Sequence, residues 1–169
     1  ILYPTDTIWG IGCDATDTVA IQKIFLLKKR DEKKSMIILL AQKKEISNYV
    51  SGPSKKILGA LEESKKPITG IFENAINLPA SLINEDGSIA IRIVKDDFCK
   101  KLIERIRVPL VATSANISGD SYPSNFTEIS AEIKNGVDYI VQHSKNDSKI
   151  FQPSSIIKLN DEGDIEKIR

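Results

Sequence analysis

The sequence predicts a mixed α/β fold, and three observations lead to that prediction. Short apolar runs of strand length alternate with amphipathic stretches along the 169 residues, as expected when strands and helices are interleaved. The run at 36–41 is apolar throughout, which is typical of a strand buried on both faces. Residues 88–93 instead alternate, with Ile89, Ile91 and Ile93 on one face, as in a strand with one apolar side.

The first half of the chain contains two predicted helices. Asp17 and Thr18 are good helix-starting residues, and apolar side chains recur after them at helical spacing. Ser51-Gly52-Pro53 is a turn, and a second helix is expected from there to about residue 63. The strands predicted in this half lie at 1–3, 36–41 and 68–72.

In the second half, a helix is expected from Asp97 to Ile106, because its apolar residues form one stripe. Asn125 and Glu128 have the spacing of a capping box, so another helix is expected to about residue 134. Beyond the alternating strand at 88–93, apolar runs predict strands at 109–112, 137–142, 154–159 and 164–168.

Composition favours one ordinary globular domain over residues 1–169. The chain is 41% hydrophobic and 28% charged with a net charge of +1, so nothing in the overall charge predicts a nucleic-acid or membrane partner. Cys13 and Cys99 are far apart and form no CxxC pair, which argues against a disulfide framework or a zinc site and favours the cytoplasm. No apolar run approaches the roughly 20 residues of a membrane span.

The opening stretch ILYPTDTIWGIGCDA is one candidate binding site. Thr5 and Thr7 are two residues apart, so an extended chain would point both hydroxyls into one cavity. Gly10 and Gly12 would let the backbone approach a ligand closely. A capped turn explains the same residues, and the chain has no P-loop motif.

Basic residues form two further candidates. Lys28, Arg30 and Lys34 follow the first helix, where cations suit the helix dipole on a solvated surface or, turned inward, neutralise phosphate. Arg92 shares its strand face with Ser88 and a small residue only. That face is therefore either open to water or the wall of a polar pocket, in which Arg92 would bind a carboxylate.

The last candidate is the end of the strand at 109–112, which runs into Thr113, Ser114 and Asn116. Ligands of α/β sheets tend to lie beyond the carboxyl ends of strands, although a polar surface loop has the same composition. Ser154 repeats the pattern of a small hydroxyl at a strand edge. The lone histidine, His143, has no evident nucleophilic partner, and no acidic group has metal-ligand spacing. A pocket of hydroxyls and cations would suit an anionic, phosphate-bearing substrate.

The combination of motifs resembles the YrdC-like family of threonylcarbamoyl-AMP synthases. The resemblance rests on YPTDTIWGIGCDA, the K-x-R of residues 28–30, GSIAIRI, TSANISG and PSSIIKL, in the family's order over essentially the whole chain. It implies a twisted mixed sheet flanked by helices, with a basic concave cavity. The helix that usually begins the family domain is expected to be absent here.

The resemblance also implies a reaction and its participants. L-Threonine, bicarbonate and ATP would give threonylcarbamoyl-AMP and pyrophosphate, for the threonylcarbamoyladenosine modification of tRNA. Mg²⁺ would accompany ATP, with no permanent cofactor and no protein metal site. Downstream partners would be tRNA or tRNA-modification proteins, and no membrane is implied.

By matching positions, the resemblance assigns three groups of site residues. The catalytic group would be Lys28, Arg30, Ser114 and Asn116. The threonine-binding group would be Thr7, Arg92, Thr113 and Ser154, with Arg92 on the carboxylate. The nucleotide-binding group would be Arg30, Lys34, Ser88, Ser114, Tyr122 and Arg169.

The chain departs from the family pattern near its first cations and in the next strand. Asp31 follows Arg30 where the family commonly has Pro, and Trp9 replaces a Tyr. Leu39 stands where a histidine is often found, which would remove one threonine contact. Two alternatives to the synthase therefore remain: a YrdC-fold RNA-binding or ribosome-associated module without synthase activity, and transfer of an unsubstituted carbamoyl group as in hydrogenase-maturation relatives.

Overall fold

The computed structural model describes residues 1–34, 36–145 and 152–169. In these ranges the strands are β1 (Leu2–Tyr3), β2 (Gly10–Ile11), β3 (Ile37–Leu40), β4 (Ile68–Phe72), β5 (Ile89–Ile93), β6 (Leu110–Ser114), β7 (Ser155–Leu159) and β8 (Ile165–Lys167). The helices are α1 (Thr18–Leu27), α2 (Lys55–Glu63), α3 (Asp97–Ile106) and α4 (Ala131–Asn135), with 3₁₀ helices η1 (Lys43–Asn48) and η2 (Ala80–Leu82).

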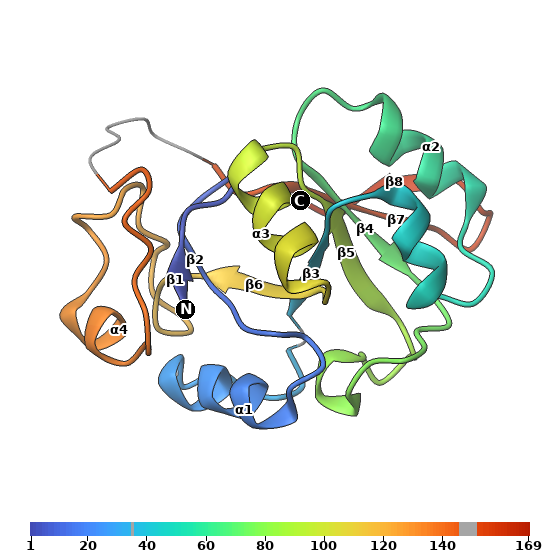
Figure 1. The fold of residues 1–169 in the computed structure, drawn as a ribbon. Coiled ribbons are helices and arrows are strands. Elements are labelled where there is room, and N and C mark those ends of the chain that lie inside the picture. The colour runs from blue at the N-terminus through green and yellow to red at the C-terminus, as the bar shows by residue number, and fades with distance from the viewer. Residues whose placement is uncertain (35, 146–151) are drawn as a thin grey trace.

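The strands form one mixed sheet in the order β1-β2-β6-β3-β5-β4-β7-β8, so the predicted mixed α/β fold is confirmed. The pairs β3–β5 and β4–β7 are parallel, and the other neighbouring pairs are antiparallel. Segments far apart in the sequence therefore lie side by side near the centre of the molecule (Figure 1).

Two hydrophobic clusters show how helices cover the sheet. Ile38 and Leu40 of β3 belong to the cluster that includes the apolar faces of α1 and α2. Leu39 points the other way, into a cluster with Cys99 and Ile103 of α3. β3 is thus buried on both faces, as its apolar run predicted.

The helix starts follow local side-chain chemistry. The Asp17 carboxylate accepts from the N–H groups of Val19 and Ala20 at the start of α1, and Asp96 caps α3 through the N–H of Cys99. The bounds predicted for the strand at 68–72 and the helix at 97–106 match β4 and α3. No helix in the described part of the chain is long and apolar enough to cross a membrane.

Two predicted elements are wrong. Asn125 accepts from the N–H groups of Thr127 and Glu128, but this bonding closes a turn, and α4 begins only after Ser130 caps it. The predicted strand at 137–142 forms one isolated bridge, between Ile140 and Leu2. At 125–128, the short polar side chain of Asn125 thus favours a local turn over a regular element.

Candidate functional site

A cavity of about 410 Å³ opens on the α3 side of the sheet. Its floor includes Ala90 and Arg92 of β5, and Ile37 and Ala112 contribute from β3 and β6. Arg92 is paired in register with Leu39 of β3, so it occupies the sheet face that α3 partly covers. The strand face that carries Arg92 is therefore the wall of a pocket. The alternative, that this face is open to water, is wrong.

Most of the predicted site residues line this cavity. They are Thr7, Arg30, Lys34, Arg92, Thr113, Ser114, Tyr122, Ser154 and Arg169. They come from both ends and the middle of the chain, because the strand order pairs β6 with β2 and β7 with β4.

The charge on the cavity wall has one sign. The lining includes Arg30, Lys34, Arg92 and Arg169, and among the residues that the structure describes it includes no Asp or Glu. Burial lowers the pKa of the Arg169 guanidinium, and the nearby charge of Arg92 lowers it further. Burial also lowers the pKa of Arg30. Cations held this close together favour binding of an anion.

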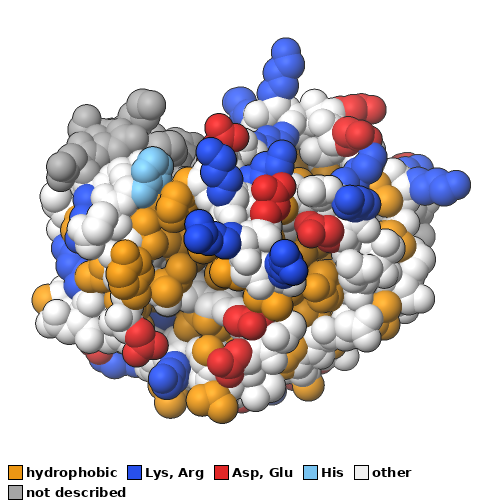
Figure 2. All heavy atoms as spheres, viewed as in Figure 1, with side chains coloured by type: hydrophobic (Ala, Val, Ile, Leu, Met, Phe, Trp, Pro, Cys, Tyr) orange, Lys and Arg blue, Asp and Glu red, His pale blue; other side chains and the backbone are white. Residues whose placement is uncertain are grey.

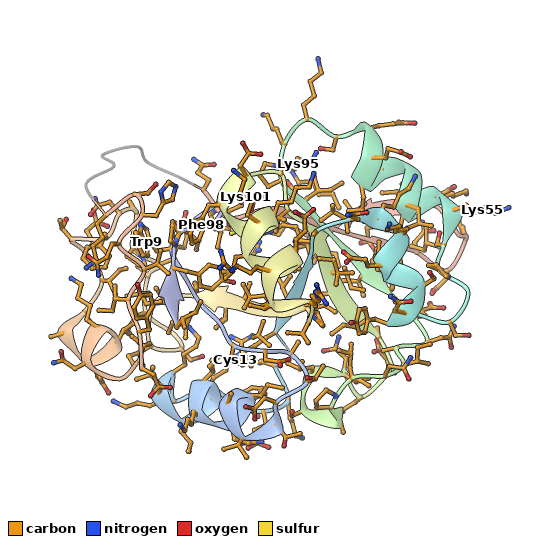
Figure 3. The ribbon with its side chains drawn as sticks, in the orientation of Figure 1. Trp9, Cys13, Lys55, Lys95, Phe98 and Lys101 are labelled. Carbon is orange, nitrogen blue, oxygen red and sulfur yellow. The ribbon has the colours of Figure 1, made fainter. Side chains whose placement is uncertain are left out.

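The outer face of the molecule that Figure 2 shows has no such uniform charge. On the face shown in Figure 2, Lys and Arg side chains are interspersed with Asp and Glu. Lys95 and Lys101, labelled in Figure 3, lie beside and on α3 with Phe98 between them in sequence. The uniform positive charge of the cavity wall thus does not extend over this face.

The opening corner is a hydrogen-bonded network beneath the cavity. Thr7 Oγ1 lies 2.8 Å from Thr5 Oγ1 and accepts from Arg92 Nη1 at 3.1 Å. Asp6 Oδ1 lies 3.2 Å from Arg92 Nη2, an ion pair by distance without hydrogen-bond geometry. Both charged side chains are almost fully buried. Burial raises the pKa of the Asp6 carboxyl, and the Arg92 charge opposes that rise.

The glycines of this corner have different roles. Gly10 lines the cavity, as expected for a close approach to a ligand. A Cβ on Gly12 would lie 2.1 Å from the Val111 carbonyl oxygen, so Gly12 is required for packing against β6. Trp9, labelled in Figure 3, does not line the cavity and packs on Phe126 with ring centroids 4.9 Å apart.

Lys28 is placed differently from the prediction. Its side chain is buried and does not line the cavity. Its ammonium donates to the Ser114 carbonyl at 2.5 Å and to the Asn116 carbonyl at 2.6 Å. Burial, together with the charge of Arg30, lowers the pKa of Lys28 to about 7. The contacts of Lys28 therefore go to the backbone of the loop that carries Ser114.

Replacing Lys28 with Met should flatten the pH dependence of the unfolding free energy above neutrality. Its pKa is about 7 in the folded chain against 10.5 as the ordinary value, so the unfolded chain binds more protons between these values. Wild-type stability should therefore rise with pH there, by at most about 1.4 kcal/mol per pH unit. Urea titrations of wild type and variant across this range measure the difference.

The exposed neighbour Lys29, ion-paired with Glu132, provides the matched control. Lys29→Met should keep the wild-type rise in stability with pH. An equal rise in Lys28→Met would show that the buried ammonium does not lose its proton in this range.

Asn116 and Ser88 also lie outside the cavity lining. The Asn116 amide donates to the carbonyls of Ile117 and Asp120 and so closes its own loop. Ser88 faces a second hollow of about 450 Å³ and accepts from Asn84 Nδ2 at 2.9 Å. Their predicted direct contacts with nucleotide or carbamate are not supported by these positions.

Asn84 and Thr5 also line the cavity, although neither belongs to the three groups of site residues that the family resemblance assigned. Asn84 lies in a polar turn whose sequence gives no indication of a site, whereas Thr5 was visible in the opening motif at a two-residue spacing from Thr7. Leu39 does not line the cavity, because its side chain packs under α3. Within the described residues, no group of three or more His, Cys, Asp or Glu could hold a metal ion.

Comparisons with known proteins identify relatives along the whole chain. The Sua5_yciO_yrdC family model, described as "Telomere recombination", matches residues 1–169. A provisionally named threonylcarbamoyl-AMP synthase of Methanocaldococcus jannaschii is 34% identical over 164 residues, covering 96% of this chain and 75% of the relative. A threonylcarbamoyl-AMP synthase of Pseudoalteromonas translucida is 28% identical over 159 residues, covering 92% of this chain and 84% of the relative.

One similar solved structure is P. abyssi Sua5 complexed with L-threonine. It has a TM-score of 0.82 at 23% sequence identity and covers 94% of this chain. The chain spans 46% of the length of that protein, so the likeness shows a shared fold over about half of the larger chain.

Proposed function

Because this chain belongs to the Sua5/YciO/YrdC family, we propose that it is an L-threonylcarbamoyladenylate synthase. It makes threonylcarbamoyl-AMP and pyrophosphate from L-threonine, bicarbonate and ATP, and the product serves threonylcarbamoyladenosine modification of tRNA in the cytoplasm. Residues 1–169 act in this proposal as one catalytic domain. The names of the two curated relatives and the L-threonine complex of P. abyssi Sua5 support it.

The observation that carries the proposal is the composition of the cavity wall. Four cations and several hydroxyls converge there from several strands and loops, with no carboxylate in the described lining. A triphosphate and an amino-acid carboxylate are the anions that such a wall would hold. Mg²⁺ would enter bound to ATP.

The chemistry needs positioning and charge neutralisation more than a dedicated base. The amine of threonine and bicarbonate form a carbamate with loss of water. A carbamate oxygen then bonds to the α-phosphorus as the bond to the departing pyrophosphate breaks. Arg30 and Lys34 on the wall would neutralise the phosphate charge in this step, and the Arg92 end of the cavity would hold threonine.

The proposed roles of Lys28 and Asn116 differ from their predicted roles. Ser114, Thr113 and Ser154 line the cavity and are proposed to contact substrate. Lys28 and Asn116 are instead proposed to maintain the loop after β6, since their polar groups contact its backbone. Tyr122 and Arg169 lie at the cavity and are proposed to contact the nucleotide.

Pyrophosphate release from purified chain tests the activity. Release should require ATP, L-threonine and bicarbonate together, and mass spectrometry should find threonylcarbamoyl-AMP in equal amount. Omission of L-threonine or of bicarbonate should reduce the rate of pyrophosphate release to background. Tight tRNA binding that persists without ATP, with no adenylate formed, would instead support the RNA-binding alternative.

A further inference from the structure

The hydrogen bonds of the opening corner can run in only one direction. At one end is the Ile8 carbonyl, which only accepts, 2.8 Å from Thr5 Oγ1. At the other end is the Arg92 guanidinium, which only donates, 3.1 Å from Thr7 Oγ1. The two hydroxyls between them are 2.8 Å apart. Distance alone leaves the donor of that middle bond open, but the ends decide it.

Each hydroxyl has one proton to donate. Thr5 uses its proton on the Ile8 carbonyl, so Thr7 must be the donor of the bond between the two threonines. Thr5 Oγ1 also accepts from the Thr7 backbone N–H at 3.0 Å, which fills its second lone pair. The order is therefore Arg92 to Thr7 to Thr5 to the Ile8 carbonyl.

This order leaves the Thr7 hydroxyl with one unused hydrogen-bonding position. Its proton goes to Thr5 and one lone pair is taken by Arg92, so one lone pair is left. Thr7 lines the cavity and is buried. Any hydrogen bond from Thr7 to a ligand must therefore be accepted from an N–H or O–H group of that ligand.

We propose that Thr5 is a positioning residue that makes Thr7 an obligatory hydrogen-bond acceptor, so that Thr7 binds an N–H or O–H donor of the amino-acid substrate and rejects its carboxylate. This inference rests on the proposed function and adds a rule for how the substrate is oriented. The carboxylate must then lie toward the cationic groups of the wall, and the amine or the side-chain hydroxyl toward Thr7. A neutral donor suits this place, because four cations surround the cavity.

The variant Thr5→Val tests the inference with little change in shape. It removes the acceptor for the Thr7 proton, so Thr7 becomes free to donate into the cavity or to rotate. We expect the Kd for L-threonine to rise about tenfold, the loss of one well-made hydrogen bond, while the Kd for ATP changes less than about twofold. Isothermal titration measures both constants.

Two further variants separate positioning from a general loss of structure. Thr5→Ser keeps the hydroxyl and should restore wild-type affinity for L-threonine. Thr16→Val makes the same chemical change at an exposed threonine whose N–H and hydroxyl donate to the Asp14 carboxylate, and should bind both ligands as the wild type does. If Thr5→Val melts early, the ATP titration of that variant at low temperature still reports whether the cavity is intact.

The outcomes distinguish this inference from the proposed function. A wild-type chain that binds no L-threonine would overturn both. Normal wild-type binding together with unchanged L-threonine binding in Thr5→Val would overturn the inference alone, as would an equal loss of ATP affinity in that variant.

Two analogues of L-threonine identify the group from which Thr7 accepts its hydrogen bond. L-Valine lacks the side-chain hydroxyl of threonine, and 3-hydroxybutyrate lacks its amine. The rise in Kd caused by Thr5→Val should disappear for the analogue that lacks the contacting donor. A penalty that stays full with both analogues would contradict the inference, because neither donor would then contact Thr7.

Discussion

Arg30→Ala is expected to reduce the rate of threonylcarbamoyl-AMP formation at least about 100-fold, the loss typical when one charge-stabilising group is removed from a phosphoryl or acyl transfer site. Arg30 lines the cavity beside Lys34, and its Nε donates to the Lys34 carbonyl at 2.8 Å. The guanidinium thus combines a charge on the wall with a hydrogen bond that shapes the turn carrying Lys34. Pyrophosphate release under saturating substrates measures the effect.

The fold should survive this substitution. Arg30 is only half-buried, and the loss of its hydrogen bond to the Lys34 carbonyl should lower the unfolding free energy by about 1 kcal/mol. Arg105→Ala, at an exposed site on α3, is the matched control and should keep full turnover. Near-normal turnover in Arg30→Ala would remove Arg30 from the catalytic group.

Arg92→Ala is expected to raise the KM for L-threonine about 10- to 100-fold while changing the KM for ATP far less. The range follows from the free energy of a hydrogen bond to a charged group. Arg92 is buried between Asp6 and Thr7, at the end of the cavity proposed for threonine. Steady-state kinetics with each substrate varied in turn separate the two constants.

The same variant should also be less stable, because it leaves the buried Asp6 carboxylate without its partner. Burial already raises the pKa of Asp6, and Arg92 is the charge that opposes the rise. In the variant the pKa of Asp6 should rise further. A carboxyl whose pKa is raised on folding favours the folded state below its unfolded pKa, so the instability should shrink as the pH is lowered.

Adding Asp6→Asn to Arg92→Ala removes the unpartnered charge and controls for that instability. The double variant should regain stability at neutral pH but keep the high KM for threonine. Recovery of the threonine KM in the double variant would mean that Arg92 acts on the fold and not on the substrate.

The elements that could be predicted were those whose local pattern and tertiary environment agree. The apolar run at 36–41 and the alternation at 88–93 both correspond to observed strands, although Arg92 on the polar face of β5 is buried as well. Asp17, predicted as a helix-starting residue, caps α1 through bonds to neighbours in the sequence. Such features need no knowledge of distant residues.

What could not be predicted depends on partners far along the chain. β2 is only two residues long and exists because β1 and β6 flank it. Lys28 is buried by hydrogen bonds to the Ser114 and Asn116 carbonyls, which lie more than eighty residues away in the sequence. The pairing of Asp6 with Arg92 is equally remote, so the sequence indicated the cavity residues but not which of them contact each other.

The strand order has a consequence for how the chain folds. The cavity needs β2 to pair with β6 and β4 to pair with β7, and each pairing closes a loop that spans roughly half of the chain. Contacts between such distant segments form slowly, because the entropy of loop closure is lost before the contacts stabilise the chain. The cavity should therefore be among the last parts to assemble, and a bound substrate should act mainly by slowing unfolding.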